Sequence, residues 1–332
     1  MWRPLKNLLA TLTSVSLLLI FCGVMVCLLN RWDSMVAITL IPIWTWAGFG
    51  MLTALISWLL FRGTLNIAVL CLWLISAILI SEEPRSFVRE LALSFKGDAP
   101  SENQSTIRIV NINANESEAL LRRVIELKPD IVVIQKAPRE KSLEAIAEDL
   151  YGLDKLLVIN QSNAIIARGE LINTLSETED STLHLRLKSP EGHVFDITNV
   201  DLDPYLPSPK LWRKKVWKRL TITRIKNRRL LRRYLGENQM TEGSISRIIS
   251  GGFGTPPGDD VYRPLETAQL SDAFARAGTG WGNTYPGRYP LVRLDQVWVS
   301  PDITPLRVTS QPNPGSTHRI VIADLALKKS PK

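Results

Sequence analysis

The chain has 332 residues, enough for two ordinary domains, and its 40 Lys or Arg against 32 Asp or Glu give a formal net charge of +8. Its 3 cysteines all lie in apolar stretches, so disulfides cannot hold the polar part of the chain together. The excess of positive charge favours an anionic partner over a cationic one.

The first 84 residues are almost uncharged. Three apolar stretches, residues 8–29, 35–61 and 63–81, each approach the ~20 residues that a helix needs to cross the hydrocarbon layer of a membrane. We predict three transmembrane helices that form an anchor over residues 1–84. None of the stretches contains Asp, Glu, Lys or Arg, which argues against a transporter or a proton relay.

The charges around this multi-pass anchor hardly determine its orientation in the membrane. Three cations, Arg3, Lys6 and Arg62, would lie on one side of the membrane, and Arg31, Arg85 and Arg89 would lie on the other. Because cytoplasmic loops usually carry the excess of Lys and Arg, this tie gives only a slight preference. We expect the N-terminus inside and the large domain outside the cytoplasm.

Residues 85–105 connect the anchor to the polar part. Phe87, Leu91 and Phe95 recur at four-residue spacing among cations, which predicts an amphipathic helix. That helix either lies at the membrane interface or packs on its own domain. Residues 97–105 are polar and indicate a linker.

From Thr106 onward, apolar runs of strand type alternate with helical spacing. We predict helices at 116–127, with Asn115 as its cap, at 141–150 and at 209–235. The predicted strands are 107–110, 131–134, 156–159, 163–167, 182–188, 194–199, 246–250, 293–299, 306–309 and 320–327. About ten strands with few helices favour an α/β domain of two packed sheets flanked by helices over one doubly wound sheet.

Eight short segments of this domain occur in the order of the landmarks of a known superfamily. They are residues 107–113, 128–135, 199–204, 251–257, 270–274, 280–286, 293–295 and 316–318. Together they resemble the endonuclease/exonuclease/phosphatase superfamily. The resemblance implies a four-layer α/β sandwich over residues 106–332, and a fold whose members mostly use Mg²⁺ to cleave phosphate esters.

The same resemblance assigns the site residues. Three functional residues of the superfamily pattern are present, as Asn113, Asp295 and His318. Five other positions depart from it: the metal-binding Glu, a His, an Asp, an Asn and the Asp before the final His are replaced by Lys136, Asp201, Gly252, Gly254 and Thr317.

These departures bear directly on the chemistry. Lys136 places an ammonium where the resemblance implies the main metal-binding carboxylate, so it repels a cation instead of attracting it. Gly252 removes the group that would align the nucleophile, and Gly254 removes an amide donor. With Thr317 in place of Asp, we expect His318 to lack a carboxylate partner. Since loss of one electrostatic donor costs ~10²–10³ in rate, we predict a pseudoenzyme with a binding or scaffolding role and no cofactor.

Two other interpretations stay open. Asp201, Asp203 and Asp295 form an alternative Mg²⁺ site if they converge, which would make the protein an active but atypical phosphomono- or phosphodiesterase. Against this, Asp203 precedes a proline as turn carboxylates do, and Asp295 is equally well explained as an ion-pair partner of Arg293. Lys136 either holds a phosphate as a point charge or extends out of a filled cleft.

Asp259 and Asp260 lie close to the glycine-rich segment in sequence. They are expected in a solvated loop, where acidic residues are common, rather than as metal ligands.

The most concentrated charge lies between Lys210 and Tyr234, which contains twelve Lys or Arg and no acid. Because like charges one turn apart destabilise a helix by ~0.2–0.5 kcal/mol per pair, the row indicates an external anion, with a solvated face as the alternative. The candidate anion-binding residues are Arg213, Lys214, Lys215, Lys218, Arg228, Arg229 and Arg232. As partners we rank anionic lipid head groups first, a phosphorylated ligand or glycan second and nucleic acid last.

Overall fold

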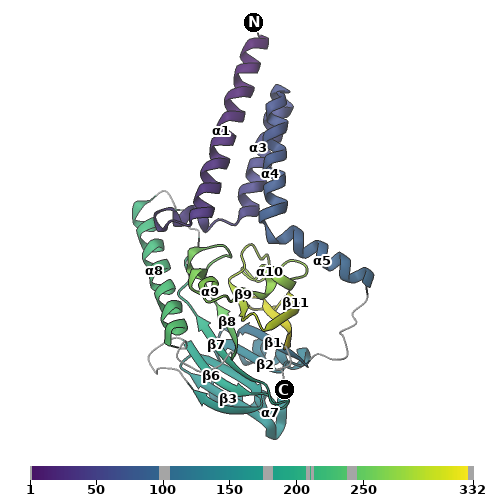
Figure 1. Ribbon diagram of the computed structural model, residues 1–332, viewed down its shortest axis with the longest axis vertical. Helices are drawn as coiled ribbons and strands as arrows, with labels where there is room; N and C mark the ends of the chain where they lie inside the picture. The colour runs from purple at the N-terminus through teal and green to yellow at the C-terminus, as the bar shows by residue number, and fades with distance from the viewer. Residues whose placement is uncertain are drawn as a thin grey trace. The chain divides into compact units, whose positions relative to one another are not determined.

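A computed structural model of the chain describes residues 2–96, 105–174, 182–206, 210, 213–237 and 245–327 (Figure 1). The predicted linker lies almost wholly outside these residues. The chain forms two compact units, and the first comprises Met1–Arg85, Leu206–Ile225 and Pro256–Asp260. The second unit comprises Ser86–Tyr205, Lys226–Thr255 and Val261–Lys332.

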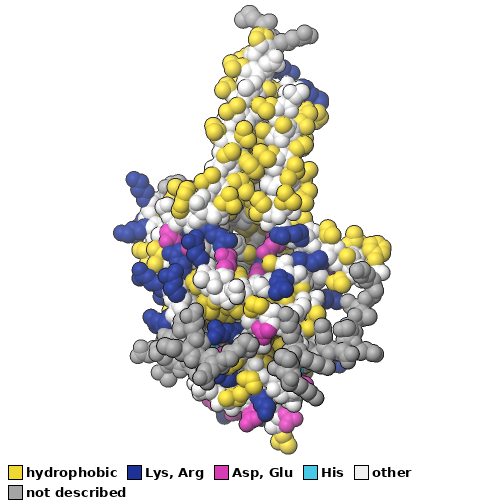
Figure 2. All heavy atoms as spheres, viewed as in Figure 1, with side chains coloured by type: hydrophobic (Ala, Val, Ile, Leu, Met, Phe, Trp, Pro, Cys, Tyr) yellow, Lys and Arg dark blue, Asp and Glu magenta, His cyan; other side chains and the backbone are white. Residues whose placement is uncertain are grey.

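The first unit contains three long apolar helices, α1 (Trp2–Asn30), α3 (Ile43–Phe61) and α4 (Thr64–Ile80). Within the described residues, Pro4–Asn30 and Ile43–Phe61 are long and apolar enough to cross a membrane. Figure 2 shows hydrophobic side chains over the surface of these helices. Helix α4 has 17 residues and reaches such a length only together with α5 (Glu82–Lys96), at a bend of 62°. Two of the three predicted spans thus have the length and composition that a membrane span needs.

The second predicted span begins later than expected. Residues Asp33–Met35 form a 3-10 turn and Val36–Thr39 a short helix, α2, before α3 begins at Ile43. The cause is Pro42, which lacks an N–H and restricts the residue before it, so that the chain cannot continue as a helix through this point.

Close contacts join the apolar helices to each other. The hydroxyl groups of Thr13 in α1 and Ser57 in α3 lie 2.7 Å apart. A Cβ atom at Gly50 of α3 would lie 2.2 Å from the ring of Trp73 in α4. In a membrane the hydrophobic effect does not favour contacts between helices over contacts with lipid. Small residues and hydroxyl hydrogen bonds are the contacts that let helices pack tightly there.

The second unit contains two mixed sheets of six strands each (Figure 1). In sheet order the first is β11 (Ile303–Gln311), β12 (Ile320–Leu327), β1 (Ser105–Asn113), β2 (Ile131–Gln135), β4 (Asn163–Arg168) and β3 (Lys155–Asn160). The second is β5 (Glu170–Thr174), β6 (Thr182–Lys188), β7 (Val194–Asp201), β8 (Ser246–Gly252), β10 (Asp295–Val299) and β9 (Ser271–Asp272). Each sheet has one parallel pair at its centre, β1 with β2 and β7 with β8.

Strand β2 illustrates why the two sheets pack as layers. All five of its residues are buried, because successive side chains point to opposite faces of a sheet. Val133 joins the core shared by the two sheets, whereas Val132 and Ile134 pack with Leu143 of helix α7 (Glu140–Tyr151). The fold is thus the predicted α/β sandwich of two packed mixed sheets flanked by helices.

Some local predictions were wrong. The helix predicted at 116–127 is divided into α6 (Glu118–Leu121) and a 3-10 segment, Arg122–Leu127. Its cap is Ser117, whose side chain accepts a hydrogen bond from the backbone of Leu120, instead of Asn115. Strand β5 was not predicted, because all of its residues are exposed and an edge strand of this kind lacks the alternation that marks a half-buried strand.

The remaining helices are α8 (Lys214–Glu237), α9 (Arg263–Thr267) and α10 (Ala273–Ala277). Helix α5 packs on its own domain through one face: the Arg89 guanidinium donates to the carbonyl groups of Ala275 and Gly278 at the end of α10. Its other face is apolar and exposed, with Val88 at 67% and Phe95 at 83% exposure.

Candidate functional site

The candidate site lies where the two central parallel pairs of strands end. Asn113 ends β1, and Lys136 directly follows β2. In the second sheet, Gly252 at the end of β8 pairs with Asp201 of β7 on one side and with Asp295 of β10 on the other. The register of the strands therefore places Asp201, Gly252 and Asp295 side by side.

The two carboxylates converge on the place that a side chain at position 252 would occupy. A Cβ atom on Gly252 would lie 3.4 Å from Oδ1 of Asp201 and 3.7 Å from Oδ1 of Asp295. Oδ1 of Asp295 is buried and accepts no hydrogen bond from the described residues. The site thus contains two carboxylates beside Gly252.

His318 retains a carboxylate partner, contrary to the expectation drawn from Thr317. Its Nδ1 atom lies 2.8 Å from Oδ2 of Asp295. Burial lowers the pKa of His318, but the charge and the hydrogen bond of Asp295 together raise it by more than burial lowers it. This pKa therefore lies above its ordinary value. The partner comes from β10, and Thr317 itself is exposed.

The side chains of Thr284 and Tyr285 help to hold this pair in place. The hydroxyl oxygen of Thr284 accepts hydrogen bonds from the N–H groups of Leu294 and Asp295, at 3.0 and 3.2 Å. The ring of Tyr285 lies 5.2 Å from that of His318, between centroids. Thr284 and Tyr285 thus position the Asp295–His318 pair together with the strand pairing of Asp295 and Gly252.

Lys136 is exposed and adopts a left-handed backbone conformation, with φ +47°. Burial raises the pKa of Asp201, and the charge of Lys136 opposes that shift. The same charge lowers the pKa of His318. The ammonium group thus acts electrostatically on both residues, and the site combines cationic and anionic groups.

Beneath the site, buried amide side chains join the two sheets. The side-chain nitrogen of Gln135 donates to the amide oxygens of Asn111 and Asn199, both at 2.8 Å. Asn111 in turn donates to the carbonyl of Gly251, at 3.2 Å. Sequence reasoning missed this network, although polar residues at the ends of otherwise apolar strands were a usable signal.

Asn113 is also buried, at 5% exposure, and its side-chain oxygen accepts a hydrogen bond from the backbone of Asn115, at 3.2 Å. This residue therefore supports the turn after β1 at the edge of the site.

Gly254 has φ +67°, and a Cβ atom there would lie 2.7 Å from the Cα of Pro204. Its carbonyl accepts a hydrogen bond from the backbone of Tyr205, at 3.0 Å. The position thus requires glycine for steric reasons, whereas Gly252 has space for a side chain. The backbone therefore requires glycine at position 254 but not at position 252.

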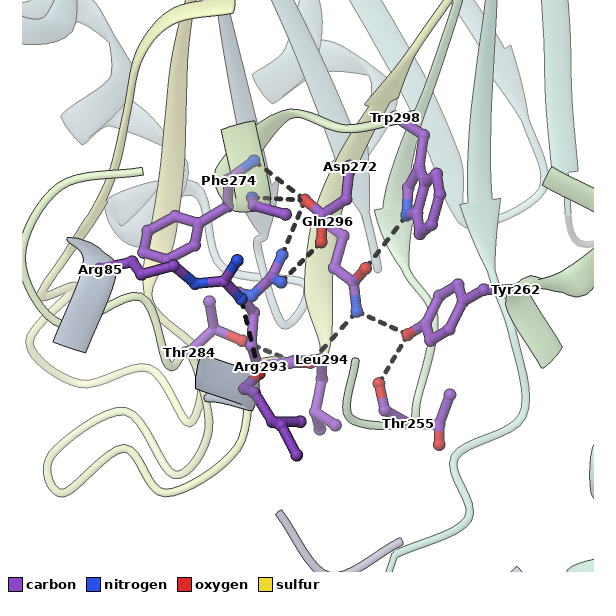
Figure 3. A network of polar contacts seen from close by, with 12 residues as sticks. Arg85, Thr255, Tyr262, Asp272, Phe274, Thr284, Arg293, Leu294, Gln296 and Trp298 are labelled. Atoms are coloured by element: carbon purple, nitrogen blue, oxygen red, sulfur yellow. Dashed lines mark hydrogen bonds and ion pairs between the residues drawn. The ribbon is translucent and has the colours of Figure 1, made fainter. Parts of the chain in front are cut away.

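A network around the same segment connects it to β10 (Figure 3). The Tyr262 hydroxyl donates to the carbonyl of Thr255, at 2.7 Å, and Gln296 donates to that hydroxyl, at 2.5 Å. The indole N–H of Trp298 donates to Gln296, at 3.0 Å. These contacts hold the end of the glycine-rich segment, at Thr255, against β10.

Arg293 forms an ion pair with Asp272. The interpretation of Asp295 as the ion-pair partner of Arg293 is therefore wrong. Two guanidinium nitrogens lie 3.0 and 2.6 Å from the two carboxylate oxygens of Asp272 (Figure 3). Asp272 also accepts the N–H of Phe274 and so caps α10. Because Arg293 is satisfied elsewhere, Asp295 remains available to the site.

The alternative metal set of Asp201, Asp203 and Asp295 is not assembled. Asp203 is 58% exposed and forms an ion pair with Lys226, at 2.6 Å. Within the described ranges, no three His, Cys, Asp or Glu side chains are grouped so that they could hold a metal ion. Asp295 is also engaged by His318, and Lys136 places a positive charge nearby, so the donor set fits Mg²⁺ poorly.

The expectation of a solvated loop at Asp259 and Asp260 was wrong. Their exposures are 0% and 3%. In the first unit, the Asp259 carboxylate forms an ion pair with Arg224 of α8, whose side chain is also fully buried. One of the twelve cations of the basic segment thus has an internal structural role.

The seven candidate anion-binding residues do not form one set. Lys214, Lys215 and Lys218 of α8, and Arg213 directly before this helix, belong to the first unit and are exposed. Arg228, Arg229 and Arg232 belong to the second unit, where Arg228 is half-buried.

No family model matches the sequence, and no curated protein matches it either. Solved structures do share the fold. An endonuclease/exonuclease/phosphatase family protein from Bacteroides thetaiotaomicron has a TM-score of 0.52 at 14% identity, covering 69% of this chain and 98% of its own. A mannosyl-6-phosphatase of the same species has 0.51 at 14%, covering 66% and 99%.

An endonuclease/exonuclease/phosphatase protein from Bacteroides vulgatus has a TM-score of 0.51 at 17% identity, covering 68% of this chain and 100% of its own. These likenesses establish that the α/β sandwich has the fold of the endonuclease/exonuclease/phosphatase proteins.

Proposed function

We propose that this chain is a membrane-anchored protein that binds a phosphate-bearing ligand at the ends of β2, β7 and β8 without hydrolysing it by a metal-dependent route. The observation that carries the proposal is Lys136. It is exposed and directly follows β2 at the strand ends, and its charge lowers the pKa values of Asp201 and His318.

The balance of charge supports an anionic ligand. Burial raises the pKa of Asp201 and so favours its neutral form, while Asp295 favours the cationic form of His318. Lys136 adds an ammonium donor to these groups, and hydrogen bonds to charged groups are roughly twice as strong as neutral ones. The loss of a side chain at Gly252 leaves space beside them.

The second candidate function is an atypical divalent-metal-dependent phosphoesterase that cleaves a phosphomono- or phosphodiester. Two observations favour it: Asp201 and Asp295 converge around Gly252, and the Asp295–His318 pair is intact. The poor fit of the donor set to Mg²⁺ ranks it second.

Lys136→Ala tests the first proposal. The full chain in detergent micelles is titrated with inorganic phosphate and, because one structural neighbour is a mannosyl-6-phosphatase, with mannose 6-phosphate. Loss of one charge-assisted hydrogen bond of ~1.5–3 kcal/mol weakens binding by roughly 10- to 100-fold.

Lys128→Ala is the matched control. Lys128 is likewise exposed, has the same φ of +47°, and precedes β2 whereas Lys136 follows it. The proposal predicts parental affinity for this variant. Equal affinity of the Lys136→Ala variant and the parent, or no binding by the parent, would contradict it.

A further inference from the structure

The first half of helix α8 is fixed to the end of the first apolar helix. One guanidinium nitrogen of Arg224 donates to the carbonyl groups of Arg31 and Trp32, both at 3.2 Å. The hydroxyl of Thr221 donates to the carbonyl of Asp33, at 3.0 Å. Because the candidate span ends at Asn30, α8 is attached at the first residues beyond it.

This attachment is buried and belongs to the first unit alone. The Arg224 side chain has 0% exposure, and its second terminal nitrogen binds the carboxylate of Asp259 and the hydroxyl of Thr39. A buried guanidinium with charged and neutral acceptors holds a fixed geometry. The neighbouring Trp32 is 48% exposed, as expected of an aromatic residue at a membrane interface.

Five cations precede this attachment on the same helix and turn. They are all exposed, and no described acidic residue forms an ion pair with them: Arg213, Lys214, Lys215, Lys218 and Arg219. In Figure 2 Lys and Arg side chains gather over α8. Farther along the helix the pattern changes, since Lys226 is already paired with Asp203.

The geometry limits how far these cations lie from the end of the span. An α-helix rises ~1.5 Å per residue, so Lys218 and Arg219 lie within ~9 Å of Arg224 along the axis and Lys214, the first residue of α8, within ~15 Å. The head-group layer extends ~5–7 Å beyond the hydrocarbon, and surface charge is felt over a Debye length of ~8–10 Å. The set therefore lies within reach of lipid head groups.

We propose that Arg213, Lys214, Lys215, Lys218 and Arg219 form a binding surface for anionic lipid head groups beside the first apolar helix. Their mutual repulsion along the helix is relieved when lipid phosphates neutralise them. This proposal is independent of the phosphate-ligand site, because it involves the first unit and none of the residues at the strand ends.

Native mass spectrometry of the full chain tests it, in micelles with equal amounts of phosphatidylglycerol and phosphatidylcholine. The double variant Lys215→Gln, Lys218→Gln is compared with Arg229→Gln, Arg232→Gln, which removes two exposed cations at the same spacing from the other half of α8. We expect the first variant to lose its preference for retained phosphatidylglycerol, by roughly fivefold per cation, and the second to keep it.

Parental preference in the first variant, or an equal loss in both, would overturn the proposal. Two further arms distinguish other anions. If millimolar inorganic phosphate displaces phosphatidylglycerol completely, the site is one for free phosphate. If the first variant instead loses binding to a single-stranded oligonucleotide and keeps its lipid preference, the cations serve nucleic acid, and the lipid proposal is again overturned.

Discussion

The imidazole of His318 and the carboxylate of Asp295 form a pair with 2.8 Å between Nδ1 and Oδ2. The pair survives although the residue before His318 is Thr317, because its acidic member is supplied by the start of β10. A carboxylate on Nδ1 fixes the tautomer of the ring and stabilises its cationic form. The site thus contains a carboxylate–imidazole pair on which the charge of Lys136 acts.

The first prediction concerns the pKa of His318. Asp295→Asn removes the charge that outweighs burial, so we expect this pKa to fall below its ordinary value of 6.5. The measurement is NMR titration of histidine-labelled protein, in which only 3 histidines are present. An unchanged pKa would show that the pair does not control the charge of the ring.

The buried His184 and the half-buried His318 should make opposite contributions to stability as pH changes. The folded-state pKa of His318 is raised, so its stabilising contribution is full below about pH 6.5 and is lost as pH rises through the raised value. Burial lowers the pKa of His184 from 6.5 to about 4. Its contribution is full above pH 6.5 and is lost as pH falls toward 4, by up to ~3 kcal/mol.

Apparent melting temperatures of the full chain and of a His184→Gln variant between pH 7 and 4 check the second part. The variant should show a shallower fall in melting temperature on acidification than the parent. A parallel fall in both proteins would assign the acid sensitivity to other groups.

The buried ion pair of Arg224 should dominate the stability of the first unit. Arg224→Ala leaves Asp259 buried without its partner, which typically costs ~3–5 kcal/mol. Lys226→Ala, two residues away, breaks an ion pair whose members are 61% and 58% exposed, and such pairs contribute at most ~1 kcal/mol. Thermal unfolding followed by tryptophan fluorescence should therefore show a large loss only for the first variant; comparable losses would contradict this account.

Gly252 and Gly254 should respond differently to the same substitution. Gly254→Ala forces a side chain into a φ of +67° and against Pro204, at a cost of ~1–3 kcal/mol. Gly252→Ala meets only ordinary contacts and should leave the free energy of unfolding unchanged or raise it by up to ~1 kcal/mol. Equal destabilisation by both would show that the backbone at position 252 is also constrained.

Much of the fold was predictable because its strands carry strong local patterns. Residues 182–188 and 320–327 were predicted with the bounds that β6 and β12 have, since apolar runs bounded by turn residues identify buried strands. The edge strand β5 and the break before α3 were not predicted. In the first, exposure removes the pattern; in the second, Pro42 interrupts a segment that is apolar throughout.

The site was predictable only as a set of positions. The strand order places Asp201, Gly252 and Asp295 side by side, but side-chain partners depend on tertiary geometry that no local pattern contains. Asp295 was thus assigned to Arg293 as an alternative, whereas it pairs with His318. Asp259 and Arg224, from distant segments, became a buried ion pair for the same reason.

The central claim is that the site binds phosphate without metal-dependent hydrolysis. The most direct measurement is turnover of p-nitrophenyl phosphate and bis-p-nitrophenyl phosphate by the full chain with Mg²⁺ or Mn²⁺, beside the Asp295→Ala and His318→Ala variants. The account predicts no metal-dependent turnover above that of the variants. Robust turnover that both substitutions abolish would contradict it and establish the second candidate function.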